Sequence, residues 1–258
     1  MSTPSTAPLL PDTLQWLPAA GRAEQLMILL HGWGASAAAM APLAMALRAE
    51  FPQAALLAPE GFEPADSALA GRQWFQMNGS DGPLTEANRP ARVAAVLPRL
   101  ADWVRAAQAA TGVGPAATAL VGFSQGAIVA LELAQAFPGL VGRVVAVAGR
   151  YATLPARAPA AVVHLVHGKE DRVMPARHCV DAATRLVTLG GDVTADVVPG
   201  VGHEAHPALL DAAIGHLQTF LPRRVWEEAL ADAPLMATRA DSRDLERPPA
   251  PRAANDPL

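Results

Sequence analysis

The chain has 258 residues, 51% of them hydrophobic and 17% charged, which favours one large globular domain over two. Its net charge of −4 supplies no basic surface for nucleic acid or for anionic lipid. A single cysteine, Cys179, excludes an intramolecular disulfide and favours a cytoplasmic protein. The first residues lack the pattern of a signal peptide, and no apolar run approaches the ~20 residues of a membrane span. We therefore expect neither export nor a membrane span.

Strand-like runs rich in Val, Ile and Leu alternate with Ala-rich helical segments along most of the chain. The predicted strands cover residues 25–30, 54–58, 118–123, 143–148, 161–166 and 193–198. The predicted helices cover residues 37–50, 91–110, 125–137, 175–189 and 207–220. Strands that are apolar on consecutive residues are covered on both faces, and alternation with helices makes them mostly parallel. The sequence thus predicts an open α/β sheet with helices on both faces.

The domain boundaries follow from the same pattern. Residues 1–23 are predicted to hold an N-terminal segment with the first strand, and residues 24–231 the main domain. Pro98 is expected to kink the helix around it, because proline removes a backbone donor and clashes with the preceding turn. A short amphipathic piece is expected at 225–230. The segment 232–258 is Pro-rich, charged and poor in large apolar residues, which predicts a tail without fixed structure.

The stretch Gly122-Phe123-Ser124-Gln125-Gly126 joins a predicted strand directly to a predicted helix. Glycines two residues on either side of the serine indicate a turn so tight that a side chain there would collide with the backbone. This spacing is the G-x-S-x-G pattern of a nucleophile elbow. A serine is a weak nucleophile at neutral pH, so it needs a histidine base and a carboxylate that orients the histidine.

Both partners can be found after later strands, in the order expected for this type of sheet. Glu170 and Asp171 follow the strand at 161–166, and we prefer Asp171 because a loop into a proline-started helix comes directly after it. His203 lies in a glycine-flanked loop after the strand at 193–198. His206, three residues further on, is the competing candidate for the base. The sequence predicts Ser124, Asp171 and His203 as a catalytic triad at one sheet edge.

Attack by a serine also needs backbone N–H groups that stabilise the oxyanion. One predicted donor is the N–H of Gln125, which follows the nucleophile at a helix N-terminus. The other is the N–H of Trp33, between Gly32 and Gly34 in the loop after an early strand. We expect no metal and no cofactor.

The long connection from residue 59 to residue 90 carries several large apolar side chains, and a connection of this length is typical of a functional loop. Together with Trp33 and the loop after Asp171, it predicts a substrate pocket. The predicted pocket residues are Trp74, Phe75, Met77, Val173 and Met174. The alternative is that Trp74 and Phe75 only anchor the connection to the body of the protein.

The remaining candidates have simpler interpretations. His31 is expected to shape its loop through hydrogen bonds, and Cys179 to be a small core residue. His164 is placed in a buried strand, His178 and His216 in helices, and Trp103 and Trp226 among packing residues.

The stretches HGWGAS, RQWFQ, GFSQGA, HGKEDRVMP and GVGHE resemble the serine carboxylesterase and acyl-protein thioesterase branch of the α/β-hydrolases, closest to the bacterial YpfH-type esterases. The similarity covers roughly residues 24 to 230. It implies an α/β-hydrolase fold without a lid domain and hydrolysis of acyl esters or thioesters. The chain has Trp33 where the thioesterases commonly have leucine, and Ala127 where they often have glycine. The indole of Trp33 could obstruct a long acyl chain.

These observations predict a serine carboxylesterase that hydrolyses short-to-medium acyl esters through an acyl-enzyme. The expected partner is a small-molecule ester. The alternatives are an acyl-protein or acyl-CoA thioesterase and, in another class, a non-catalytic binding module of the same fold. A binding module should have lost at least one triad residue, whereas this chain has all three. The oligomeric state is open, with a homodimer among the possibilities.

Overall fold

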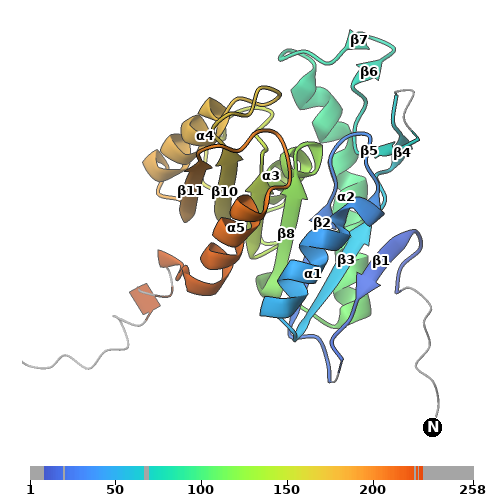
Figure 1. Cartoon of the computed structure of the whole chain (residues 1–258), viewed down its shortest axis with the longest axis vertical. Coiled ribbons are helices and arrows are strands. Elements are labelled where there is room, and N and C mark those ends of the chain that lie inside the picture. Colours follow the sequence, from blue (N-terminus) through green and yellow to red (C-terminus); the bar gives the residue numbers. More distant parts are fainter. Residues whose placement is uncertain (1–8, 20, 67–69, 224, 226, 229–258) are drawn as a thin grey trace, which may run out of the picture. The chain divides into compact units, whose positions relative to one another are not determined.

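The computed structural model describes residues 9–19, 21–66, 70–223, 225 and 227–228 (Figure 1). Residues 1–220 form one unit, and residues 221–258 form a second unit that lies mostly outside the described residues. The predicted tail at 232–258, Trp226 and part of the predicted piece at 225–230 also lie outside them.

A seven-stranded sheet forms the centre of the described part of the first unit. Its strands are β1 (Thr13–Trp16), β2 (Gln25–Leu30), β3 (Ala54–Pro59), β8 (Thr118–Phe123), β9 (Arg143–Val147), β10 (Val162–Gly168) and β11 (Val193–Val198). The order across the sheet is β1-β3-β2-β8-β9-β10-β11. Only the pairing of β1 with β3 is antiparallel among these strands. The prediction of a mostly parallel sheet is confirmed.

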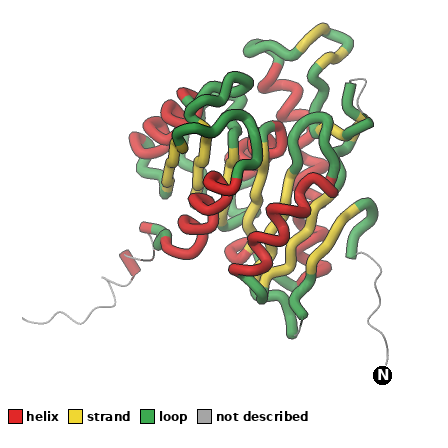
Figure 2. Tube along the Cα trace, viewed as in Figure 1, coloured by secondary structure: helices red, strands yellow, loops and turns green. Residues whose placement is uncertain are grey.

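Helices cover both faces of this sheet (Figure 2). They are the 3-10 helices η1 (Ala37–Met40) and η2 (Pro115–Ala117) and the α-helices α1 (Ala41–Glu50), α2 (Arg89–Thr111), α3 (Gln125–Ala136), α4 (Arg177–Thr188) and α5 (Pro207–Thr219). One apolar cluster joins α1 and α5 to one face, and another joins α2, α3 and α4 to the opposite face. No separate lid domain interrupts the described chain. None of the described helices has both the length and the apolar character of a membrane span.

Helix α2 runs through Pro98 as one helix, rather than ending at it. Pro98 lies on the exposed side, as does Ala94, whose carbonyl loses its helical partner to the proline. Because that carbonyl is on the side that faces solvent, water can replace the missing donor. The burial pattern explains why the proline is tolerated within the helix.

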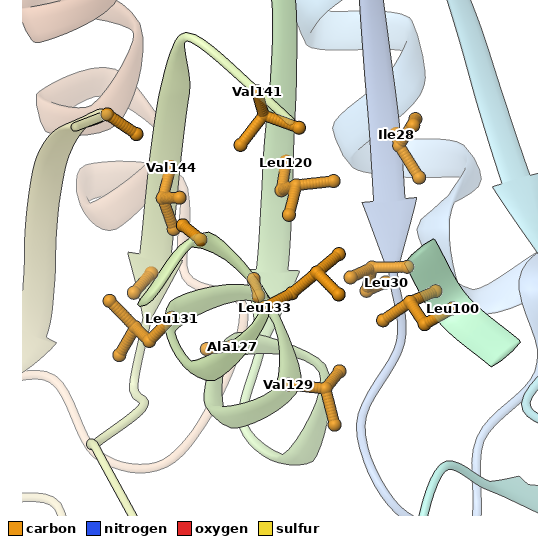
Figure 3. Close-up of a cluster of buried hydrophobic side chains, with 14 of the residues drawn as sticks. Ile28, Leu30, Leu100, Leu120, Ala127, Val129, Leu131, Leu133, Val141 and Val144 are labelled. Atoms are coloured by element: carbon orange, nitrogen blue, oxygen red, sulfur yellow. The ribbon is translucent and has the colours of Figure 1, made fainter. Parts of the chain in front are cut away.

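The core is densest where α3 crosses the middle strands. Figure 3 shows α3 side chains, among them Leu131 and Leu133, gathered against Leu120 of β8 and Val144 of β9. All four of these side chains are fully buried. At roughly 1.5–3 kcal/mol for each buried side chain of this size, this packing fixes α3 and the residue before it, Ser124, against the sheet.

Strand register aligns the carboxyl ends of the central strands. Phe123 pairs with Val147, and Gly168 pairs with Val198. The loops after β8, β9, β10 and β11 therefore leave the same edge of the sheet, where ligands bind in folds of this class.

The connection between β3 and α2 contains two small antiparallel pairs that the sequence did not predict. They are formed by β4 (Glu63–Pro64) with β5 (Arg72–Gln73) and by β6 (Asn78–Gly79) with β7 (Gly82–Pro83). Each strand has only two residues, which is too short for a periodic pattern to be recognised.

Candidate active site

The turn at Ser124 has the strained backbone of a nucleophile elbow. Ser124 alone separates β8 from α3, with φ 53° and ψ −115°, values that residues other than glycine rarely adopt. A Cβ atom at Gly122 would lie 2.4 Å from the carbonyl oxygen of Gly126, and one at Gly126 would lie 2.0 Å from that of Leu30. The collision expected from the two glycines is thus confirmed.

The three predicted triad residues lie within hydrogen-bond reach of one another. Nε2 of His203 is 2.9 Å from Oγ of Ser124, and Nδ1 of His203 is 2.7 Å from Oδ2 of Asp171. The Asp171 side chain is fully buried, and that of His203 is 15% exposed. With its proton on Nδ1, the imidazole donates to Asp171 and presents Nε2 as the acceptor for the serine proton.

The carboxylate of Asp171 is held by several donors. Its Oδ1 accepts the backbone N–H groups of Val173 at 2.9 Å and Met174 at 2.7 Å. Burial acts to raise the pKa of Asp171, but the hydrogen bonds from His203, Met174 and Val173 outweigh it and leave the pKa below its ordinary value. Asp171 therefore stays ionised at neutral pH and keeps the imidazole oriented.

His167, in β10, is a residue of this site that the sequence reasoning missed. Its Nε2 lies 3.1 Å from Oδ2 of Asp171 and 2.6 Å from the carbonyl oxygen of Met174. Both neighbours are acceptors, so Nε2 carries a proton and donates to them. The ring is buried. The only sequence signal was a histidine four residues before the predicted acid, which by itself does not distinguish support from packing.

The competing acid and base make other contacts. The carboxylate of Glu170 accepts the backbone N–H of Val201 at 3.2 Å. His206 is the N-cap of α5, and its Nδ1 accepts the N–H of Ala208 at 3.2 Å. The geometry therefore favours Asp171 and His203 over these alternatives.

Both predicted oxyanion donors belong to segments that border Ser124. Gln125 is the first residue of α3, where backbone N–H groups have no acceptor within the helix. Trp33 follows Gly32, at which a Cβ atom would lie 3.4 Å from the Cβ of Ser124. Both backbone segments therefore lie close enough to Ser124 to be candidates for the oxyanion donors.

Ser124 and His203 open into a cavity of about 680 Å³, within the usual range for small-molecule sites. Most of its lining is apolar. Of the predicted pocket residues, Phe75, Met77, Val173 and Met174 line it, as does Trp33. The indole Nε1 of Trp33 donates to Asp66 at 3.0 Å and to Gln73 at 3.2 Å, which ties this wall to the β3–α2 connection.

Trp74 does not line the cavity, so its assignment to the pocket is wrong. It is fully buried, its Nε1 donates to the carbonyl oxygen of His31 at 2.8 Å, and its backbone N–H donates to Oε1 of Gln125 at 2.8 Å. The indole N–H needs a partner when buried, and that partner lies in the core. Trp74 is an anchor, whereas its neighbour Phe75 is both buried and part of the cavity wall.

Comparison with known proteins identifies the class of protein. The family model described as Phospholipase/Carboxylesterase matches residues 17–221, which is most of the chain. The chain belongs to this family. Esterase YpfH of Escherichia coli (strain K12) is 44% identical over 210 residues, which cover 81% of this chain and 88% of that protein.

Solved structures agree with this assignment. The crystal structure of esterase PE8 superposes with a TM-score of 0.74 at 29% identity, covering 81% of this chain and 99% of that one. A carboxylesterase from Mesorhizobium loti has a TM-score of 0.67 at 22% identity, covering 83% and 99%, and this likeness supports the fold alone. The predicted α/β-hydrolase fold and carboxylesterase function are confirmed. These comparisons do not support a homodimer.

His31 and Cys179 make structural contacts in this carboxylesterase. His31 accepts the N–H of Gly61 at Nε2, 2.9 Å away, so its Nδ1 donates to the carbonyl oxygen of Gly32 at 2.7 Å. It thereby joins two loops, as expected. Burial and the charge of Asp196 raise the pKa of Cys179 to about 12, which makes it an unreactive core thiol.

Proposed function

We propose that this carboxylesterase hydrolyses short-to-medium acyl esters through an acyl-enzyme formed on Ser124. The observation that carries the proposal is the hydrogen-bonded chain from Ser124 through His203 to Asp171, at 2.9 and 2.7 Å, beside a mostly apolar cavity. The expected substrate is a small-molecule ester, with the acyl chain against apolar lining.

The reaction uses these groups in two stages. Oγ of Ser124 attacks the ester carbonyl carbon while its proton moves to Nε2 of His203, and the N–H groups of Trp33 and Gln125 stabilise the oxyanion. Collapse expels the alcohol, which takes the proton from His203. A water molecule then attacks the acyl-enzyme, again losing its proton to His203, and the carboxylic acid leaves as Ser124 regains its proton. Asp171 keeps the imidazole in the Nδ1–H tautomer throughout.

Replacement of the nucleophile and the base tests the proposal. Ser124→Ala should lower kcat by ~10⁴–10⁶-fold and abolish labelling by a fluorophosphonate probe. His203→Ala should behave similarly, whereas His206→Ala should keep most of the activity because His206 caps a helix. If Ser124→Ala kept a tenth of the wild-type rate, the serine mechanism would be refuted.

Trp33 is proposed to limit the length of the acyl chain. Its side chain is 36% exposed, lines the cavity and is tied to the β3–α2 connection by two hydrogen bonds. Each buried methylene contributes only ~0.8 kcal/mol, so one clash with an indole cancels several of them. Trp33→Leu should shift kcat/KM towards longer p-nitrophenyl esters without moving the backbone donor. A wild type already best on palmitoyl esters or thioesters would favour the acyl-protein thioesterase alternative.

A cytoplasmic location is a further part of the proposal. It rests on the absence of any disulfide, since the chain has one cysteine and Cys179 is buried as a free thiol. Fractionation of cells that express the full chain, followed by detection of the enzyme in the cytoplasmic or exported fraction, tests this location directly.

A further inference from the structure

The cavity beside Ser124 has two chemically different walls. On the side of α1 and α5, the lining is apolar and includes Met40, Pro42, Leu43 and Leu210. On the side of α2 and α4, it includes the charged side chains Glu86, Arg89, Arg150 and Arg177. We call these four residues the arginine wall. All the Asp, Glu, Lys and Arg residues that line the described cavity belong to it.

The arginine wall is held together by ion pairs. Nη1 and Nη2 of Arg150 donate to the two carboxylate oxygens of Glu86 at 2.9 and 2.8 Å, and Nη1 of Arg89 lies 2.7 Å from Oε2 of Glu86. The Arg89 and Arg150 side chains are only 14% and 16% exposed. Their rigid guanidinium groups are thus already fixed and partly desolvated, which lowers the cost of ordering them around a ligand.

One carboxylate does not balance the charge of this wall. Hydrogen bonds from Arg89 and Arg150 lower the pKa of Glu86 to about 2, so Glu86 is ionised at neutral pH. Burial, followed by the charges of Arg150 and Arg177, lowers the pKa of His178, which keeps this lining residue neutral. Among the residues that line the cavity, three guanidinium groups and one carboxylate leave two positive charges in excess. Asp181 of α4, whose charge also acts on His178, lies outside this lining.

The backbone connects Arg150 closely to the nucleophile. The carbonyl oxygen of Val147, at the end of β9, accepts the N–H of Ser124 at 3.0 Å. Between Val147 and Arg150, Ala148 has φ 50° and a Cβ at Gly149 would lie 2.3 Å from that of Ala127. A positive φ at a non-glycine residue costs about 1–3 kcal/mol and clusters at ligand sites. This strained turn holds Arg150 at the cavity.

From the unequal walls, we infer that the arginine wall is a subsite for a carboxylate carried by the ester substrate. Guanidinium groups bind carboxylates through paired, charge-assisted hydrogen bonds, and a partly enclosed cavity strengthens the attraction. The apolar wall of α1 and α5 would then contact the uncharged part of the ester. The inference rests on the proposed function, since the charged and the uncharged part of the ester must lie on either side of the bond that Ser124 attacks.

Matched esters test the inference and locate the carboxylate. In the acyl arm, p-nitrophenyl hydrogen glutarate is compared with p-nitrophenyl methyl glutarate, which has the same chain without the charge. In the alcohol arm, 4-acetoxybenzoate is compared with methyl 4-acetoxybenzoate. The wild type should favour the anionic ester by roughly tenfold in kcat/KM in one arm, about 1.4 kcal/mol. The preference should fall modestly with added salt, because the exposed charge of Arg177 is screened, whereas the partly buried Arg89 and Arg150 are screened less.

Variants separate a binding role from a structural one. Arg177→Gln changes an exposed side chain and should reduce the anionic-to-neutral ratio about threefold, with little change for the neutral ester. Arg105→Gln, on the exposed side of α2 and outside the cavity, is the matched control and should leave the ratio unchanged. Glu86→Gln removes the negative charge but keeps a side-chain oxygen that can accept from Arg89 and Arg150, so it should increase the anionic-to-neutral ratio. A purely structural cluster would instead change both rates equally.

The outcomes distinguish the inference from the proposed function. If kcat/KM for the anionic ester does not exceed that for the neutral ester in either arm, and the neutral esters are still hydrolysed, the carboxylate subsite is refuted. The esterase mechanism is then unaffected. A ratio that Arg177→Gln and Glu86→Gln both leave unchanged also refutes the subsite. Failure to hydrolyse every ester, together with no fluorophosphonate label on Ser124, overturns the proposed function itself.

Discussion

The nucleophile elbow (residues 122–126) and the connection between β3 and α2 (residues 60–88) both border the cavity, but different interactions hold them. In the elbow, glycines approach backbone atoms so closely that no side chain fits. In the connection, Trp74 and Phe75 are buried and form backbone hydrogen bonds with the side chain of Gln125. The amide oxygen of Gln125 accepts the N–H of Trp74, and its amide nitrogen donates to the carbonyl oxygen of Phe75, both at 2.8 Å.

This difference shows two ways of positioning a site. Possible backbone collisions restrict the elbow within a few consecutive residues, so a short sequence motif is enough to predict its geometry. The connection depends on hydrogen bonds from residues about fifty positions away in the sequence. The elbow should therefore fail abruptly when its glycines are changed, whereas the connection should loosen in measurable steps.

The largest effect is expected from Gly126→Ala. Its new Cβ would lie 2.0 Å from the carbonyl oxygen of Leu30 and 2.7 Å from that of His31, and both are backbone atoms that cannot rotate away. The free energy of unfolding, measured in urea, should fall by at least about 3 kcal/mol. Gly215→Ala, in α5 with nothing within 4 Å, is the matched control and should stabilise the protein by about 1 kcal/mol. Equal effects of the two variants would contradict the steric account of the elbow.

Gln125→Ala tests the connection. It leaves the N–H of Trp74 and the carbonyl of Phe75 buried without their present partner, which should cost roughly 2–4 kcal/mol of stability. Because the connection carries Phe75 and Met77 to the cavity, kcat/KM should also fall, by up to about 100-fold. The proposed oxyanion donor at residue 125 belongs to the backbone and remains. Gln76→Ala, an exposed residue of the same connection, should change both quantities little. A stable, fully active Gln125→Ala variant would show that burial of Trp74 and Phe75 holds the connection without these hydrogen bonds.

Comparing Ser124→Gly with Ser124→Ala measures the strain stored in the elbow. Both variants lose the hydroxyl of the proposed nucleophile, but only glycine adopts a φ of 53° without strain. Relief of about 1–3 kcal/mol, offset by the greater chain entropy of unfolded glycine, should leave Ser124→Gly about 1 kcal/mol more stable than Ser124→Ala. Equal urea midpoints would mean that the turn stores little strain.

A pH-dependent effect on stability is expected at His31, which joins the loop before the elbow to the connection. Burial lowers the pKa of His31, so below pH 6.5 the unfolded chain binds a proton that the folded protein does not. Stability is therefore fully present above this pH and falls on acidification, by up to ~1.4 kcal/mol per pH unit for each such histidine. Urea unfolding at pH 7.5 and 5.5 should show a smaller loss for His31→Gln than for the wild type.

His164 provides a control for this pH dependence. Burial, with the charges of Arg143 and His216, lowers the pKa of His164 to about 3. His164→Gln should therefore also reduce the loss of stability between pH 7.5 and pH 5.5. His164 bonds to Thr194 in the sheet rather than to the connection. Cleavage of the connection by protease should therefore become faster at low pH in His164→Gln but not in His31→Gln. A wild type with equal stability at both pH values would exclude both contributions.

Much of the fold was determined by the sequence alone. Apolar runs predicted the strands from Gln25 to Val198, most clearly β2 and β3, which are buried on consecutive residues because both faces of the sheet are covered there. The sequence also predicted the elbow and the acid and base that follow it along the chain. Gly122, Ser124 and Gly126 were recognised because side chains at the two glycines would collide with nearby backbone. Asp171 and His203 were recognised because each follows the end of a predicted strand.

Only the tertiary structure decided which large and polar side chains enter the site. Trp74 and Phe75 are neighbours of similar character, yet one lies in the core and the other lines the cavity. His167 contacts the predicted acid, and Arg89, Arg150 and Arg177 reach one cavity from α2, the loop after β9 and α4. Local patterns report periodicity and turn geometry, whereas these roles depend on which partners the sheet register and helix packing bring within 3 Å. That information is distributed over the whole chain, so no short stretch of it could have predicted them.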